Sequence, residues 1–216
     1  MRDSSNVVLV FTDSINDIEI IDIKKKEKKN YKYEKDYNSV EEFNNRNKEL
    51  GDYRYYIAYG SNMSLAQMSY RCRDSRYYGT GYLEGYRLEF RDKWSNIKRN
   101  KNCRVPVVIY KISKEDEKEL DKYEKGYEKK CVEIVINNSK ITGLIYVMKK
   151  TKLSRDKKEE TKRIVKLPGK NYFDIIRNSY KFHKFNIEIL IDSLIHSFNI
   201  YYNLGLTKDN RYKYDN

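Results

Sequence analysis

The sequence predicts an α+β protein that carries an N-terminal extension. In the middle of the chain, segments that favour strands outnumber segments that favour helices. The helices stand between or after the strands without regular alternation, which favours helices packed on a curved or barrel-like sheet over a doubly wound parallel sheet. At 216 residues the chain is long enough for one domain with a buried core and a short appendage.

Residues 1–52 are expected to form the extension. Apolar runs at residues 6–11 and 18–23 flank a turn-rich spacer and predict a β-hairpin. The highly charged stretch 24–38 predicts a solvated linker or a ragged strand. Ser39 opens a capping-box pattern, so a short helix is expected to start there. This unit is either a packing extension or a small adaptor for a protein partner, and its composition does not separate the two.

The central elements follow from aromatic and apolar patterns. Residues 53–59 are rich in aromatic side chains and predict a strand, and residues 64–72 carry an apolar stripe at helical spacing. A helix is expected over residues 113–124, where Ser113 is a good N-cap and acidic residues fill the first turn. Four further segments are expected to be strands, the last two forming an antiparallel pair: residues 85–90, 104–112, 129–136 and 140–148.

The C-terminal part is expected to be helical. Residues 149–166 are mostly charged and predict a loop, whereas residues 171–182 and 186–199 predict two helices with an apolar face. The last stretch, residues 201–216, is interpreted as a tail that frays.

Composition argues against several classes of function. The formal net charge of +13 suits a nucleic-acid binder, but the basic residues are spread along the chain and interleaved with acidic ones, so nucleic-acid binding is disfavoured as the main function. No apolar run reaches the length of a membrane span, and residues 7–11 are too short and wrongly flanked for a signal peptide. A cytoplasmic protein without a membrane partner is therefore expected. The oligomeric state is not predicted.

Cysteine and histidine usage argues against a metal centre. The chain has three cysteines, an odd number without paired spacing, so a disulfide framework is not expected. His183 and His196 are its two histidines, too few to support a zinc site with those cysteines. Neither a metal nor a cofactor is predicted.

The segment Tyr59-Gly60-Ser61-Asn62 joins the first central strand to the helix that follows. Gly60 permits a positive φ and a close approach of the backbone. A helix starting at Ser61 or Asn62 would present amide groups that have no partner within the helix, and such amides hold a carboxylate or a phosphate. An ordinary strand–turn–helix corner is an equally good interpretation of these four residues alone.

Glu124 is the candidate acid/base. It stands where a helix is expected to end, with Leu120 and Tyr123 available to cover it. A carboxyl group that is partly desolvated has a raised pKa and can move a proton near neutral pH. Taken alone, a solvated glutamate at a helix end is the simpler interpretation.

Several motifs in the same order decide between these alternatives. The segments "YIAYGSNM", "GTGYLEGYRLEF", "VPVVIYKIS" and "LDKYEKGYEKK" together resemble the γ-glutamylcyclotransferase-like family. The resemblance covers residues 53–148 and extends more loosely to about residue 199, so residues 53–200 are assigned to a domain of this type. It implies a small twisted β-barrel flanked by helices.

The resemblance also implies the chemistry. In the family, an internal aminolysis closes a γ-glutamyl group to 5-oxoproline and releases an amine or amino acid, without metal or cofactor. Glu124 matches the catalytic acid/base, and Tyr127 matches the aromatic residue that follows it. The residues that match the loop for the γ-glutamyl head group are Tyr59, Gly60, Ser61 and Asn62.

This sequence departs from the family pattern at two places. Lys125 stands between Glu124 and Gly126, where the family commonly has glycine directly after the glutamate, and the link from Glu124 to Tyr127 is shorter than in many members. Residues 93–102 are strongly basic and are expected to form a loop in which Trp94 remodels one wall of the pocket. Two other functions therefore stay open: the same fold with another amide or acyl role or with no activity, and a basic adaptor that binds a protein or nucleic acid.

Overall fold

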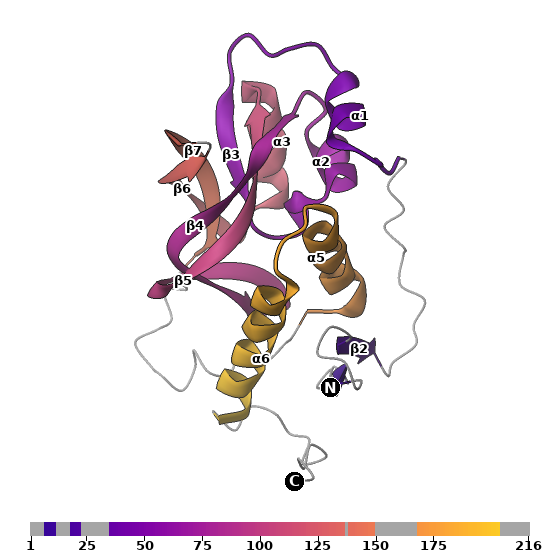
Figure 1. Ribbon diagram of the computed structural model, residues 1–216, viewed down its shortest axis with the longest axis vertical. Coiled ribbons are helices and arrows are strands. Elements are labelled where there is room, and N and C mark those ends of the chain that lie inside the picture. The colour runs from indigo at the N-terminus through magenta and orange to yellow at the C-terminus, as the bar shows by residue number, and fades with distance from the viewer. Residues whose placement is uncertain (1–6, 12–17, 23–34, 137, 150–167, 204–216) are drawn as a thin grey trace.

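The protein folds as a mixed sheet with helices packed around it (Figure 1). The computed structural model describes residues 7–11, 18–22, 35–136, 138–149 and 168–203. The predicted α+β class is confirmed. The predicted hairpin is also present as β1 (Val7–Phe11) paired antiparallel with β2 (Ile18–Asp22). Most of the expected charged linker, the charged loop after residue 149 and the end of the tail lie outside the described residues.

Five strands form the main sheet in the order β4-β5-β3-β7-β6. Their bounds are Arg54–Ala58 for β3, Arg76–Arg91 for β4, Trp94–Ile112 for β5, Tyr127–Ile136 for β6 and Ser139–Met148 for β7. Neighbouring strands are antiparallel except β3 and β7, which pair in parallel. The short strand β3 thus lies at the centre of the sheet, and its last residues are buried.

The sheet is curled but not closed, so the barrel implied by the family resemblance is only a loose description. β4 and β6 are the edge strands of the described sheet. Side chains of β6 nevertheless reach the backbone of β4, because a Cβ built on Gly79 would lie 2.6 Å from Ile136 Cδ1 and one built on Gly81 would lie 3.3 Å from Ile134 Cδ1. The two glycines leave room for isoleucines of β6, which lets the sheet curl without a hydrogen-bonded seam between its edges.

The β4–β5 hairpin is longer than the sequence predicted. Residues 93–102 were expected to form a loop, and that prediction is wrong because most of the segment belongs to β5. Asp92 and Lys93 have φ values of 48° and 75°, as a two-residue hairpin turn requires. Ile97 pairs with Leu88, and both are buried. The basic residues therefore belong to a strand. Apolar residues are too sparse in this part of the sequence for the strand to be predicted from their pattern.

The helices lie where local signals placed them. They are α1 (Val40–Asn45), α2 (Leu65–Arg71), α3 (Lys114–Tyr123), α5 (Lys170–Phe182) and α6 (Ile187–Asn203). The helix α3 has a complete capping box between Ser113 and Asp116. In α1, Ser39 caps the helix, but the Glu42 carboxylate accepts from the Asn38 amide. Among the described helices none is long and apolar enough to cross a membrane.

α1 packs into the same core as the sheet. Phe43 is fully buried and its ring lies 5.9 Å from that of Tyr110 on β5. Arg46 donates to the Cys72 carbonyl and to Ser75 Oγ, which ties α1 to the segment after α2. The division of the chain at residue 52 stays a prediction, and any such division has to break these contacts.

Candidate active site

The segment Tyr59-Gly60-Ser61-Asn62, here called the elbow, leads from β3 into a short 3-10 turn and not directly into an α-helix. This turn, η1, spans Ser61–Met63. The prediction that the next helix begins at Ser61 or Asn62 holds for this 3-10 turn, whereas the α-helix α2 begins only at Leu65 and is capped by Ser64, which is extended. Ser64 Oγ accepts from the Gln67 amide at 3.3 Å, so the serine that follows the turn sets the helix start.

Gly60 is required for close approach rather than for an unusual φ. Its φ is −115°, outside the left-handed region. A Cβ at this position would overlap with Ser95 Oγ and lie 3.5 Å from Tyr172 Oη. The backbone of the elbow therefore touches β5 and α5 at a point where only a glycine fits.

The turn leaves two backbone amides outside its own hydrogen bonds. The Met63 amide donates to the Gly60 carbonyl at 2.9 Å, and the Ser64 amide donates to the Ser61 carbonyl at 3.0 Å. The amides of Ser61 and Asn62 take no part in these bonds, as expected for the first residues of a helical turn. Both residues are buried and line a pocket, so the turn presents donors where an anionic group could lie.

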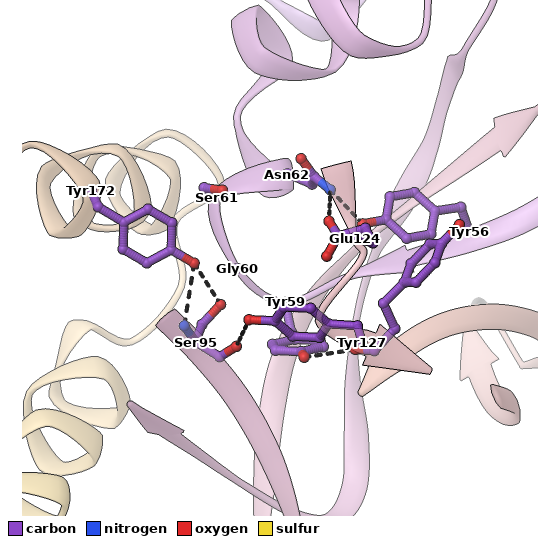
Figure 2. Close-up of a pocket in the computed structure, with 10 residues that line it drawn as sticks. Tyr56, Tyr59, Gly60, Ser61, Asn62, Ser95, Glu124, Tyr127 and Tyr172 are labelled. Carbon is purple, nitrogen blue, oxygen red and sulfur yellow. Dashed lines mark hydrogen bonds between the residues drawn. The ribbon is translucent and has the colours of Figure 1, made fainter. Parts of the chain in front are cut away.

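Glu124 faces this turn across the pocket (Figure 2). It is the C-terminal cap of α3, with its amide donating to the Leu120 carbonyl at 3.0 Å. Its side chain is 14% exposed, and Oε1 accepts from Asn62 Nδ2 at 3.2 Å. Burial raises the pKa of the Glu124 carboxyl, while nearby Arg71 and the hydrogen bond from Asn62 oppose that rise.

Tyr127 reaches the pocket through a tight turn. The Tyr127 amide donates to the Glu124 carbonyl at 2.9 Å, so α3 and β6 are joined by the short link in which Lys125 departs from the family pattern. Tyr127 Oη donates to the Ser95 carbonyl at 2.8 Å. The link thus places both predicted site residues on the wall of one pocket, with the tyrosine ring held by β5.

Aromatic rings make up most of the remaining wall. The cavity has a volume of about 40 Å³ and is lined by five tyrosines, three residues of the elbow, Ser95 and Glu124. The tyrosines come from β3, β6, β7, α5 and the elbow itself: Tyr56, Tyr127, Tyr146, Tyr172 and Tyr59. Tyr59 Oη donates to the Tyr146 carbonyl at 2.7 Å. Hydrogen bonds to the backbone therefore hold the Tyr59 and Tyr127 rings, whereas Tyr146 Oη donates to Asp121 Oδ1 at 2.8 Å.

Sequence reasoning missed four of these residues. Tyr56, Ser95, Tyr146 and Tyr172 all line the pocket, but none was named as a site residue, although Tyr56 opens the segment "YIAYGSNM" and Ser95 lies in the basic stretch 93–102. Ser95 Oγ lies 2.8 Å from Tyr172 Oη, and no local sequence pattern predicts this contact between β5 and α5. Trp94, expected to shape one wall, packs edge-on against Tyr172 with ring centroids 4.9 Å apart. It acts on the pocket through that tyrosine.

The described residues do not gather a metal site. No group of three or more histidine, cysteine, aspartate or glutamate side chains among them is arranged to hold an ion. The polar side chains that line the pocket carry one carboxyl, one carboxamide and several hydroxyls, and the first residues of the turn lie beside them. Such a set can bind an anionic head group and exchange a proton.

Solved structures share this fold. One named "Gamma-glutamyl cyclotransferase" aligns with a TM-score of 0.52 at 18% identity, over 76% of this chain and 93% of that one. The uncharacterized protein loc79017 from Homo sapiens aligns with a TM-score of 0.53 at 19% identity, over 76% and 92%. YkqA from Bacillus subtilis aligns with a TM-score of 0.53 at 19% identity, over 68% of this chain and 55% of that one. At these identities the likeness concerns the fold.

The sequence itself matches a family. A comparison with curated proteins finds no match. A family model described as gamma-glutamyl cyclotransferase, AIG2-like, matches residues 56–172. The match begins at Tyr56 and ends at Tyr172, two tyrosines of the pocket, and it spans more than half of the chain. This protein therefore belongs to the AIG2-like gamma-glutamyl cyclotransferase family.

Proposed function

We propose that this protein is a γ-glutamylcyclotransferase-type enzyme, which closes a γ-glutamyl group to 5-oxoproline and releases an amine or amino acid. The observation that carries the proposal is the pairing, in one pocket, of the buried Glu124 carboxyl with the Gly60–Asn62 elbow. Family membership supports the same class of reaction.

The pocket suits the head of such a substrate. The α-carboxylate would accept from the amides of Ser61 and Asn62, which need no charged side chain to bind it. The α-ammonium would lie near Glu124 and the tyrosine rings, whose faces attract cations. The cavity volume is about 40 Å³, so the leaving amine would extend outside it.

The reaction then needs one proton carrier. Glu124 takes a proton from the α-ammonium, and the free amine attacks the γ-carbonyl carbon to form the new C–N bond of a five-membered lactam. The bond from that carbon to the leaving nitrogen breaks, and Glu124 returns the proton to the departing amine. The attacking nitrogen gives up a second proton as the lactam forms, and this proton passes to the same amine, which leaves as an ammonium ion. The nucleophile is tethered to its target, so the main contribution of the pocket is to fold the substrate into attack geometry.

Ser61 is assigned to binding rather than to nucleophilic attack. Its hydroxyl accepts from Gln67 Nε2 at 2.6 Å. The two histidines lie elsewhere, with His183 against the Met63 carbonyl and His196 against Arg87. No imidazole is therefore placed to activate the serine, as a nucleophilic mechanism requires.

The test is formation of 5-oxoproline from γ-glutamyl amino acids and γ-glutamyl amines. Glu124→Gln keeps the shape of the side chain but cannot carry a proton, so a loss of at least about 100-fold in kcat is expected. Glu119→Gln is the matched control, because Glu119 lies on the same helix, is exposed and pairs with Lys122. Activity of Glu124→Gln close to wild type contradicts the assignment. Absence of 5-oxoproline from every substrate leaves the fold with another acyl role or none.

A further inference from the structure

The Asn62 side chain lies between two charged groups and can adopt only one orientation. Its Oδ1 accepts from Gln67 Nε2 and from Arg71 Nη1, both at 2.7 Å. Because two donors face the oxygen, the nitrogen has to point the other way. There Nδ2 donates to Glu124 Oε1 at 3.2 Å and to Tyr56 Oη at 2.7 Å. Arg71 thus fixes which atom of Asn62 meets Glu124.

Arg71 also acts on Glu124 through its charge. Arg71 Nη1 lies 3.9 Å from Glu124 Oε1, and the two side chains are 22% and 14% exposed. Among the described residues, Arg71 is the cation whose field opposes the effect of burial on the pKa of Glu124. The other titratable groups that face Glu124 across the pocket are tyrosines of β3, β6, β7, α5 and the elbow. Their neutral rings do not offset burial as a cation does.

The guanidinium of Arg71 is held in place from outside the pocket. Arg71 is the last residue of α2, and its Cζ lies 4.5 Å from the centroid of the Tyr123 ring. Tyr123 is the last residue of α3 and directly precedes Glu124. The cation–π contact therefore joins the ends of the two helices that carry Arg71 and the carboxyl.

We propose that Arg71 is a positioning residue, which orients the Asn62 amide toward Glu124 and keeps that carboxyl ionised before it receives a proton. The role in turnover rests on the proposed function. The effect on the ionisation of Glu124 does not, since it follows from contacts present without substrate. A base that is already protonated cannot accept the proton of the α-ammonium, so removal of Arg71 should cost activity most at the acid end of the pH range.

The experiment measures two quantities in the full chain. One is the titration midpoint of the Glu124 carboxyl by carbon-13 NMR, assigned from the resonance lost in Glu124→Gln. The other is the pH at which kcat/KM falls on the acid side. In Arg71→Met, which keeps the apolar stem, both midpoints should rise by about one pH unit, because an opposite charge within 4 Å has been removed.

Two further variants complete the design. Arg71→Lys restores the charge and should return both midpoints toward the wild type. Arg73→Met is the matched control, since Arg73 is an exposed cation two residues further along and should leave them unchanged. A role confined to packing would lower the stability of Arg71→Met without moving either midpoint.

Unchanged midpoints in folded Arg71→Met overturn the proposal. If that variant does not fold, Arg71→Gln takes its place, because it keeps an amide donor toward Asn62 and removes only the charge. An unchanged titration midpoint of the Glu124 carboxyl in Arg71→Gln also overturns the proposal. If the wild type forms no 5-oxoproline, the proposed function fails, while the NMR titration still decides whether Arg71 acts on Glu124.

Discussion

Gly60 shapes the pocket because it has no side chain. The elbow passes so close to β5 that an added Cβ would overlap with Ser95 Oγ, and Tyr172 Oη lies 3.5 Å from the same position. Ser95 and Tyr172 are bound to each other, so neither can withdraw alone. The position of the Ser61 and Asn62 amides therefore depends on a contact among three segments of the chain.

Gly60→Ala is expected to displace the elbow. The new methyl group should destabilise the fold by about 1–3 kcal/mol through overpacking and raise KM for a γ-glutamyl substrate more than it lowers kcat. Thermal unfolding and the 5-oxoproline assay measure the two effects. Gly51→Ala is the control, because nothing lies within 4 Å of a Cβ there. A Gly60→Ala protein with wild-type KM and stability would show that the elbow can accommodate a methyl group at this position.

The site residues that the sequence could identify are those with neighbours in a motif. Glu124 ends a capped helix and the elbow follows an aromatic strand, so their local settings were visible. Ser95 and Tyr172 have no such setting, and only the packing of β5 against α5 brings them to the pocket. For Gly60 the sequence predicted both a positive φ and a close approach of the backbone to neighbouring residues. The structure has the close approach, but its φ is negative.

At the scale of elements, α1 shows how a short helix becomes part of the core. It has only six residues, too few to be stable alone. Phe43 fills a fully buried site between Tyr37 and Tyr110, and Arg46 stacks on its outer face with Cζ 3.6 Å from the ring centroid. The helix is therefore held by its packing rather than by its propensity.

Phe43→Ala is expected to destabilise the protein by about 3 kcal/mol or more, because it empties a buried aromatic site. Urea unfolding followed by circular dichroism measures this change. Val135→Ala is the control, since that side chain is 63% exposed on β6. If Phe43→Ala is as stable as the control, α1 is only loosely attached and the division at residue 52 gains support.

Helix signals predicted elements better than strand signals did. For α3 the N-cap Ser113 and the acidic first turn are read from consecutive residues, and the structure has Ser113 as the N-cap. The first half of β5 was missed because its pairing partners lie on β4, as with Ile97 and Leu88, and because charged side chains hide its alternation. The register of a hairpin depends on both strands, and one strand alone does not reveal it.

At the scale of the whole molecule, two buried carboxyls couple folding to pH. Burial raises the pKa of Asp116 to about 6, and it also raises the pKa of Glu124. A carboxyl whose pKa is raised by folding stabilises the folded state fully below its unfolded value, about 3.9 for aspartate. That contribution is lost as the pH rises through the folded value. Asp116 therefore favours folding at about pH 4 more than at pH 7.

The Asp116 effect is measured by comparing wild type with Asp116→Asn. The difference in free energy of unfolding, wild type minus variant, should fall by on the order of 2 kcal/mol between pH 4 and pH 7. Urea titrations at several pH values give this slope. Glu115→Gln, an exposed neighbour on the same helix, is the control. A difference that is constant with pH would mean that Asp116 does not titrate as proposed.

The pocket can form only after distant parts of the chain have met. β3 pairs in parallel with β7 through Tyr55↔Gly143 and Tyr56↔Leu144, so the ladder that supports the elbow joins residues far apart in sequence. Closing so long a loop costs chain entropy before any contact offsets it, and such pairing is slow. A nascent chain that has not yet emerged as far as β7 therefore contains the elbow and Glu124 but lacks Tyr146 and Tyr172 of the pocket wall. The proposed active site is therefore completed late in folding.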